Sequence, residues 1–101
     1  MSAKFRKVSA VEFRGLGVFY GQVSVGTSAV QITTVTEARS ITIKADNDNT
    51  DAVYIGDSSV TTTTGFRLNA GEAITLYLKD PSILYAISSS ADQKIHYIGE
   101  T

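Results

Sequence analysis

His96 is the only histidine in the chain, and it is the residue whose side chain is best suited to catalysis or metal binding. A histidine can act as the base for a serine nucleophile, or it can bind zinc together with other histidines or with cysteines. The chain has no second histidine, no cysteine and no G-x-S-x-G sequence around a serine. Residues 94–98 form an alternating segment, in which an outward-facing strand residue is the simpler interpretation of His96. We therefore predict a protein that is not an enzyme, with no catalytic residue, cofactor or bound metal.

An acidic segment, residues 46–57, partly matches the spacing of a calcium-binding loop. Positions 1, 3, 5 and 12 of that loop are occupied by Asp46, Asp48, Thr50 and Asp57. Position 6 holds an aspartate instead of the turn glycine, and residues 52–55 are an apolar run typical of a strand where a helix should begin. Aspartate and asparagine are ordinary turn residues. We interpret the segment as a polar hairpin turn, and the four threonines at 61–64 as an exposed loop or edge strand.

The charged side chains are distributed unevenly. Residues 1–21 hold four of the nine basic side chains and one of the ten acidic ones. The rest of the chain is therefore acidic and would repel phosphate, so we predict no nucleic-acid partner. A basic arm before an acidic body suits an electrostatic anchor, and a solvated tail is the alternative. The chain has neither the roughly 20 consecutive apolar residues of a transmembrane helix nor a signal-peptide pattern, so we expect no membrane partner.

Threonine, valine, isoleucine and tyrosine dominate the remaining residues, and they favour strands over helices. Apolar residues alternate strictly in residues 40–45 and 73–79, which places Ile41, Ile43 and Ala45 on one face and Ile74, Leu76 and Leu78 on another. Short strands are predicted at 22–25, 29–33, 40–45, 52–55, 66–68, 73–79, 83–87 and 94–98. Their spacing and the chain length indicate one all-β domain, an antiparallel, jelly-roll-like β-sandwich of about seven or eight strands. A small Greek-key barrel is the alternative.

Residues 1–21 differ from the rest because Gly15, Gly17 and Gly21 interrupt their apolar residues. We expect an extended N-terminal arm, or an irregular first strand, over residues 1–21 and the sandwich over residues 22–101. An exposed edge strand in a short all-β chain invites pairing with another chain, which favours self-association.

Several short segments follow one another in a recurrent order. They are VGTSAVQI at 25–32, RSITIKAD at 39–46 with Asn49-Thr50, VYIG at 53–56, TGFRLNAGE at 64–72 and LYAI at 84–87. In this order the chain resembles a small β-sandwich domain of structural proteins in tailed-bacteriophage virions. The resemblance covers residues 23–98 and implies a non-enzymatic component of the particle. A chain of this size would be a capsid decoration, or cement, protein, often a homotrimer, that binds the major capsid protein lattice and stabilises the head. It would be made in the host cytoplasm and located on the capsid surface of the virion.

The arm is then a candidate for the contact with the major capsid protein. Its basic residues would meet acidic lattice surface, and its aromatic residues would be buried anchors, because so small a core cannot bury them all. The candidate partner-binding residues are Phe5, Arg6, Lys7, Phe13, Arg14, Phe19 and Tyr20.

Two alternatives remain open at the level of sequence. One places the domain in the tail, the baseplate or a head fibre of the same kind of particle. The other is a carbohydrate- or receptor-binding module that uses Tyr54, Tyr77 or Tyr85 as stacking platforms and the threonine loop for hydrogen bonds.

Overall fold

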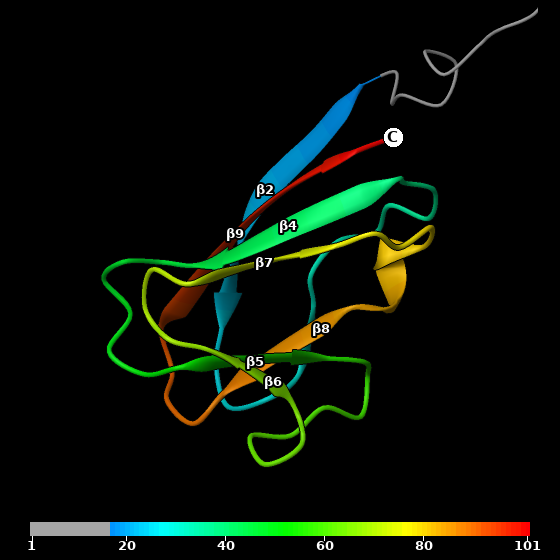
Figure 1. The fold of residues 1–101 in the computed structure, drawn as a ribbon. Helices are drawn as coiled ribbons and strands as arrows, with labels where there is room; N and C mark the ends of the chain where they lie inside the picture. The colour runs from blue at the N-terminus through cyan, green and yellow to red at the C-terminus, as the bar shows by residue number, and fades with distance from the viewer. Residues whose placement is uncertain (1–16) are drawn as a thin grey trace, which may run out of the picture.

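The alternating segments form two antiparallel sheets in the computed structural model, which describes residues 17–101 (Figure 1). In spatial order, the first sheet contains β2 (Val18–Val25), β9 (Gln93–Glu100), β4 (Ser40–Ala45) and β7 (Ala73–Leu76). The second contains β3 (Val30–Gln31), β8 (Tyr85–Ser88), β5 (Val53–Gly56) and β6 (Phe66–Leu68). A short 3₁₀ helix, η2 (Pro81–Ile83), leads into β8. The predicted all-β sandwich is therefore confirmed, with two separate sheets rather than a closed barrel. The described part of the chain contains no helix long and apolar enough to cross a membrane.

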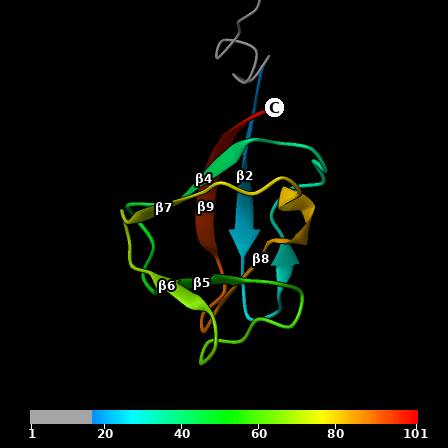
Figure 2. The ribbon, with the colours of Figure 1, turned by 45° about the vertical axis from the view of Figure 1, so that its right-hand side comes forward.

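The strand pairs are nested within one another. β2 pairs with β9, β3 with β8, β4 with β7, and β5 with β6. The chain thus behaves as one long hairpin rolled into two sheets, which is the connectivity of a jelly roll. Figure 2 shows β4 and β7 of the first sheet at one side of the molecule and β5 and β6 of the second sheet at the other. As a result, β9 lies between β2 and β4, and residues from remote parts of the sequence become neighbours on the first sheet.

The hydrophobic core lies between the two sheets. Ile41 and Ile43 of β4, Ile95 of β9 and Val53 of β5 are all completely buried. Burial of a side chain of this size contributes about 1.5–3 kcal/mol relative to leaving it exposed. The predicted inward set of β7 also packs against this core, although the strand itself ends at Leu76. The alternation read from the sequence therefore identifies the inward faces of both strands.

Strand β2 begins at Val18, four residues before the expected boundary of the sandwich. Its register with β9 is continuous, and it places Gly21 opposite Tyr97 and Phe19 opposite Gly99. A Cβ at Gly21 would lie 2.7 Å from the Tyr97 Oη, so the glycine makes room for an aromatic ring from the next strand. The division at residue 21 therefore falls inside β2, and residues 18–21 are regular strand rather than arm. Residues 1–16 of the predicted arm lie outside the described residues.

A buried glutamine fixes the turn between β4 and β5 against β9. The Gln93 Oε1 accepts hydrogen bonds from the backbone N–H groups of Thr50 (2.9 Å) and Asp51 (3.0 Å), and its Nε2 donates to the Ala91 carbonyl oxygen (2.9 Å). The side chain of Asn49 bonds both backbone groups of Lys94. This network holds the start of the turn beside the outward residues of β9. Strand β5 begins at Val53, inside the segment 46–57, so only the residues before it form the turn. Because β4 and β5 belong to different sheets, the turn crosses from one sheet to the other, and the predicted hairpin is wrong.

Candidate interaction surface on the first sheet

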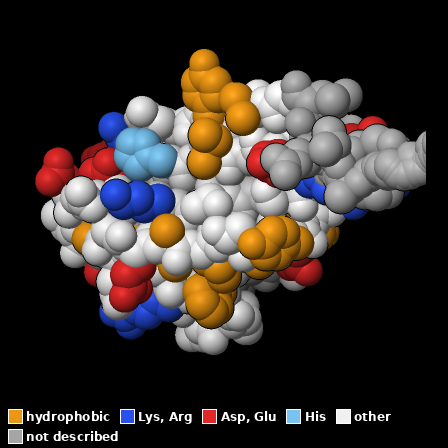
Figure 3. Space-filling model, turned by 45° about the horizontal axis from the view of Figure 1, so that its top comes forward, with side chains coloured by type: hydrophobic (Ala, Val, Ile, Leu, Met, Phe, Trp, Pro, Cys, Tyr) orange, Lys and Arg blue, Asp and Glu red, His pale blue; other side chains and the backbone are white. Residues whose placement is uncertain are grey.

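The side of the first sheet that faces away from the core carries an unusual share of exposed apolar side chains. We call this side the outer face. It is formed by Val18, Tyr20, Gln22 and Ser24 of β2, Lys94, His96, Ile98 and Glu100 of β9, Ser40, Thr42 and Lys44 of β4, and Ala73, Thr75 and the following Tyr77. Among the described residues, six large apolar side chains are exposed, and four of them belong to this face: Val18, Tyr20, Tyr77 and Ile98. Figure 3 shows apolar side chains gathered on this side of the molecule, with lysine and histidine beside them.

The register of the sheet brings these side chains together. Ile98 of β9 lies directly opposite Tyr20 on one side and Thr42 on the other. Thr42 in turn lies opposite Thr75, and the two hydroxyl oxygens are 2.7 Å apart. One row across four strands therefore runs from an aromatic ring through an isoleucine to a bonded pair of threonines. Tyr20 is 73% exposed and Ile98 is 52% exposed, so the row presents apolar surface to solvent.

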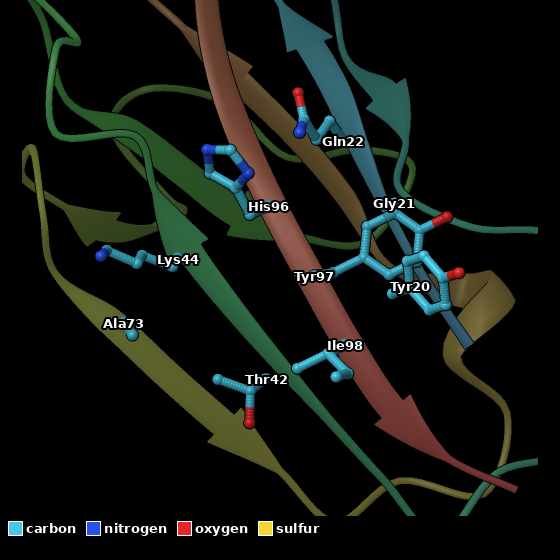
Figure 4. A pocket seen from close by; sticks show the side chains of 9 residues that line it. All are labelled: Tyr20, Gly21, Gln22, Thr42, Lys44, Ala73, His96, Tyr97 and Ile98. Carbon is cyan, nitrogen blue, oxygen red and sulfur yellow. The ribbon is translucent and has the colours of Figure 1, made fainter. Parts of the chain in front are cut away.

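The outer face is hollowed in two places. An open concavity of about 610 Å³ is lined by Tyr20, Gly21, Gln22, Thr42, Lys44, Ala73, His96, Tyr97 and Ile98 (Figure 4). A second one, of about 450 Å³, lies toward Val18 and Tyr77 and shares Thr42 and Ile98 with the first. The apolar surface is therefore concave rather than flat, and polar groups border it on the side of His96 and Lys44.

His96 and Asp46 form a hydrogen-bonded pair at this border. The His96 Nε2 and the Asp46 Oδ1 are 2.6 Å apart, and both side chains are partly exposed. The hydrogen bond from His96 lowers the pKa of the Asp46 carboxyl below its ordinary value, and the backbone N–H of Asp48 and the charge of Lys94 lower it further. His96 is thus an outward-facing strand residue held by a carboxylate. Within residues 17–101, no hydroxyl group is hydrogen-bonded to it as a nucleophile would be.

The low pKa of Asp46 predicts how this pair responds to acid. A carboxyl whose pKa is lower in the folded state stabilises the fold above its unfolded-state pKa, about 4, and loses this contribution as the pH falls through the folded-state value. We expect Asp46→Asn to have a lower thermal midpoint than the wild type at pH 6, with the difference shrinking steadily below about pH 4. Thermal melts of both proteins between about pH 2 and pH 7 check this. A constant difference over that range would contradict the role of the hydrogen-bonded Asp46 carboxylate.

The other chemical patterns of the sequence are structural turns. In residues 17–101, no group of three or more histidine, aspartate or glutamate side chains is arranged to hold a metal ion. Asp57 accepts hydrogen bonds from the backbone N–H and the hydroxyl of Ser59, which lower the pKa of its carboxyl. The threonines at 61–64 bond mainly to one another in the loop between β5 and β6. These hydrogen bonds among the threonines stabilise a tight polar loop.

The candidate partner-binding residues fall into three groups. The first group lies outside the described residues and contains Phe5, Arg6, Lys7, Phe13 and Arg14. Phe19 faces inward and packs on the core, with its ring centroid 6.2 Å from that of Tyr97, so the structure gives it a role within the sandwich. Tyr20 points outward from the edge strand β2 and lines the larger concavity of the outer face. Sequence reasoning assigned no binding role to Ile98, although its position next to Tyr97 places one apolar residue on each side of β9.

The tyrosines considered for carbohydrate stacking occupy different surfaces. Tyr77 is 85% exposed and lies on the outer face. Tyr54 and Tyr85 lie on the second sheet and are half-buried. The three rings do not form one platform.

Comparison of the chain with protein-family models, with curated proteins and with solved structures returned no match. The likeness to virion proteins therefore stays a prediction from the segments quoted above, and the geometry of the outer face carries the functional argument.

Proposed function

We propose that this chain is a non-enzymatic structural protein of a phage virion, and that it decorates the capsid by binding the major capsid protein through the outer face of its first sheet. The observation that carries the proposal is the set of four large apolar side chains exposed on this one face. Large contiguous apolar patches, of more than about a few hundred Å², are rare on monomeric soluble proteins and mark interaction sites.

The make-up of the face suits a protein partner. Interfaces between proteins favour aromatic side chains at their centre and polar groups at their rim. Ile98 on the central strand β9 and Tyr20 opposite it supply the apolar part, and the hydrogen-bonded pair of His96 and Asp46 supplies part of a polar rim. Double-sheet jelly rolls also occur in viral capsid domains, so the fold is compatible with this role. The particle and the identity of the partner are inferred from the resemblance of residues 23–98.

Two exposed isoleucines allow a matched test. Ile98 lies on the outer face and is 52% exposed, whereas Ile83 lies in η2 and is 51% exposed. Burial of the exposed half of an isoleucine contributes about 0.8–1.5 kcal/mol, so Ile98→Ser is expected to weaken binding to undecorated heads about four- to twelvefold. Ile83→Ser is expected to bind as the wild type does. Co-sedimentation of each variant with heads measures both the affinity and the number of bound copies.

The results of this experiment distinguish the proposed roles of the outer face. Equal binding by the two variants would contradict the role of the outer face. Wild-type protein that does not sediment with heads would overturn the capsid assignment, and a few copies per particle instead of hundreds would favour a tail, baseplate or head-fibre component.

A carbohydrate- or receptor-binding module is the second candidate. The observation in its favour is the concavity beside Tyr20, where Gln22, Lys44 and His96 offer hydrogen-bonding groups next to an aromatic ring. A glycan array probed with the purified chain tests it. Binding that is lost in Tyr20→Ala and kept in Tyr54→Ala would support this function.

A further inference from the structure

Strand β2 has a long edge that no described residue covers. It is the end strand of the first sheet, and its eight pairs with β9 run from Val18 to Val25 without a bulge. The other edge strands, β3, β6 and β7, are two to four residues long. A long, regular edge presents a row of backbone groups to which another strand can pair.

The hydrogen-bond pattern shows which backbone groups point away from the sheet. In an antiparallel pair, successive residues alternate between bonding the partner strand and facing away from it. The Gly17 carbonyl oxygen accepts from the Thr101 N–H (3.0 Å), so odd-numbered residues of β2 bond β9. On the other side of β9, the Lys94 carbonyl oxygen accepts from the Asp46 N–H (3.0 Å), as this alternation requires. The outward N–H and C=O groups of the edge therefore belong to Val18, Tyr20, Gln22 and Ser24.

The sequence of β2 lacks the features that protect an edge strand. Proteins commonly block such edges with lysine or other charged side chains, with proline or with a bulge. The strand reads VFYGQVSV, with no charged residue and no proline. Val18 and Tyr20 add exposed apolar side chains next to the outward backbone groups.

We propose that β2 pairs with β2 of a second copy of this chain, antiparallel, about a two-fold axis at Gly21. In this register, Tyr20 lies opposite Gln22 of the partner subunit, and Val18 lies opposite Ser24 of the partner subunit. All four outward residues of each strand are then hydrogen-bonded, and the two sheets join into one sheet of eight strands.

The properties of the β2 edge favour a second copy of the chain as its binding partner. The register above matches each outward residue with an outward residue, so the strand is complementary to itself. The absence of charge means that two copies do not repel each other along the contact. The apolar side chains of the two outer faces also meet across the axis. A two-fold contact closes with two subunits, so this dimer replaces the trimer that the resemblance implied. The inference is independent of the proposed capsid partner.

The mass of the purified chain in solution is the first test. A contact along one strand edge is smaller than the roughly 1,200–2,000 Å² of stable complexes, so light scattering after gel filtration should cover loading concentrations from about 1 µM to about 500 µM. We expect a mass that rises toward twice the 10.8 kDa of one chain. A monomer at all concentrations, or a trimer, would overturn the proposal.

Substitutions at Gln22 separate the backbone contact from the side chain. Its N–H points away from β9, so Gln22→Pro removes an outward donor and leaves the bonds to β9 in place. We expect Gln22→Pro to be monomeric and Gln22→Ala, which keeps the N–H, to dimerise like the wild type. If Gln22→Pro does not fold, Gln22→Lys serves instead, because it places like charges near the axis, and we expect it to weaken dimerisation at least tenfold. Unchanged dimerisation in the folded variant would contradict the pairing.

Cysteine cross-linking tests the register, since the natural chain has no cysteine. Directly opposed residues in this pairing lie about 5.5 Å apart between Cα atoms, within the range that a disulfide spans. A mixture of Tyr20→Cys and Gln22→Cys chains is expected to form the cross-linked dimer faster than either variant alone. Equal cross-linking by Thr75→Cys, on the opposite edge strand, would show that the contact is not specific to β2.

Discussion

Replacing Ile95 with alanine is expected to lower the free energy of unfolding by about 3 kcal/mol. Ile95 is completely buried in β9, the strand between β2 and β4. The truncation removes apolar contacts from both sheets and leaves a cavity that a sandwich cannot close without moving a whole strand. In a domain of this size, the thermal midpoint should fall by roughly 12–24 °C. Thermal and urea unfolding followed by circular dichroism measure the change.

The control for this substitution is Ile98→Ala in the same strand. Ile98 points to the outer face and is half-exposed, so its truncation should cost at most about 1 kcal/mol. Equal losses from Ile95→Ala and Ile98→Ala would contradict the assignment of the two faces of β9. A normal fold for Ile98→Ala would also support the use of Ile98→Ser in the binding experiment.

The second large effect is expected for Gly99→Ala. A Cβ at this position would lie 2.3 Å from the Phe19 Cζ and 2.4 Å from the carbonyl oxygen of Ser40. The ring can rotate away, but the carbonyl belongs to the backbone of β4 and cannot move without disturbing its pairing with β9. Overpacking of this kind costs about 1–3 kcal/mol, and we expect the upper end of that range because both neighbours are affected.

Gly17→Ala is the matched control, because a Cβ there would lie at an ordinary contact distance, 3.6 Å, from the Thr101 Oγ1. It should unfold at nearly the wild-type urea concentration. In a double-mutant cycle, Gly99→Ala should cost less in a Phe19→Ala background than in the wild type, but it should still cost stability there, since the contact with the Ser40 backbone remains. A Gly99→Ala protein as stable as the wild type would show that β2, β9 and β4 are not as close as described.

The outer face and the β2 edge are adjoining surfaces that can be tested separately. Ile98 lies one strand in from the edge, whereas Gln22 is on the edge itself. Ile98→Ser should therefore alter binding to heads with little effect on the mass in solution, and Gln22→Pro should alter the mass first. The side chains of Val18, Tyr20, Gln22 and Ser24 belong to both surfaces, so Gln22→Pro is compared with Gln22→Ala, which loses the same side chain and keeps the outward N–H.

Local patterns in the sequence determined the strands and the faces where alternation is strict. Ser40–Ala45 coincides with β4, and Phe66–Leu68 coincides with β6. The acidic run after Ala45 was correctly predicted to be a turn, because aspartate and asparagine favour turns and the Asp46 carboxylate accepts a hydrogen bond from the nearby Asp48 N–H. Such features depend on residues a few positions apart, so they can be predicted from the sequence without knowledge of the tertiary structure.

Pairing between remote segments determined which residues become neighbours on the sheets, which local sequence patterns cannot predict. The glycines near the N-terminus looked like interruptions of a strand, yet Gly21 lies opposite Tyr97, whose ring fills the space that a side chain would take. The outer face is a similar case, because Tyr20, Thr42 and Ile98 become neighbours only after β9 inserts between β2 and β4. The amino-acid sequence by itself thus determined an all-β sandwich and the composition of its strands. Only the tertiary structure decided which apolar residues stay exposed together, because that depends on which strands pair and in which register.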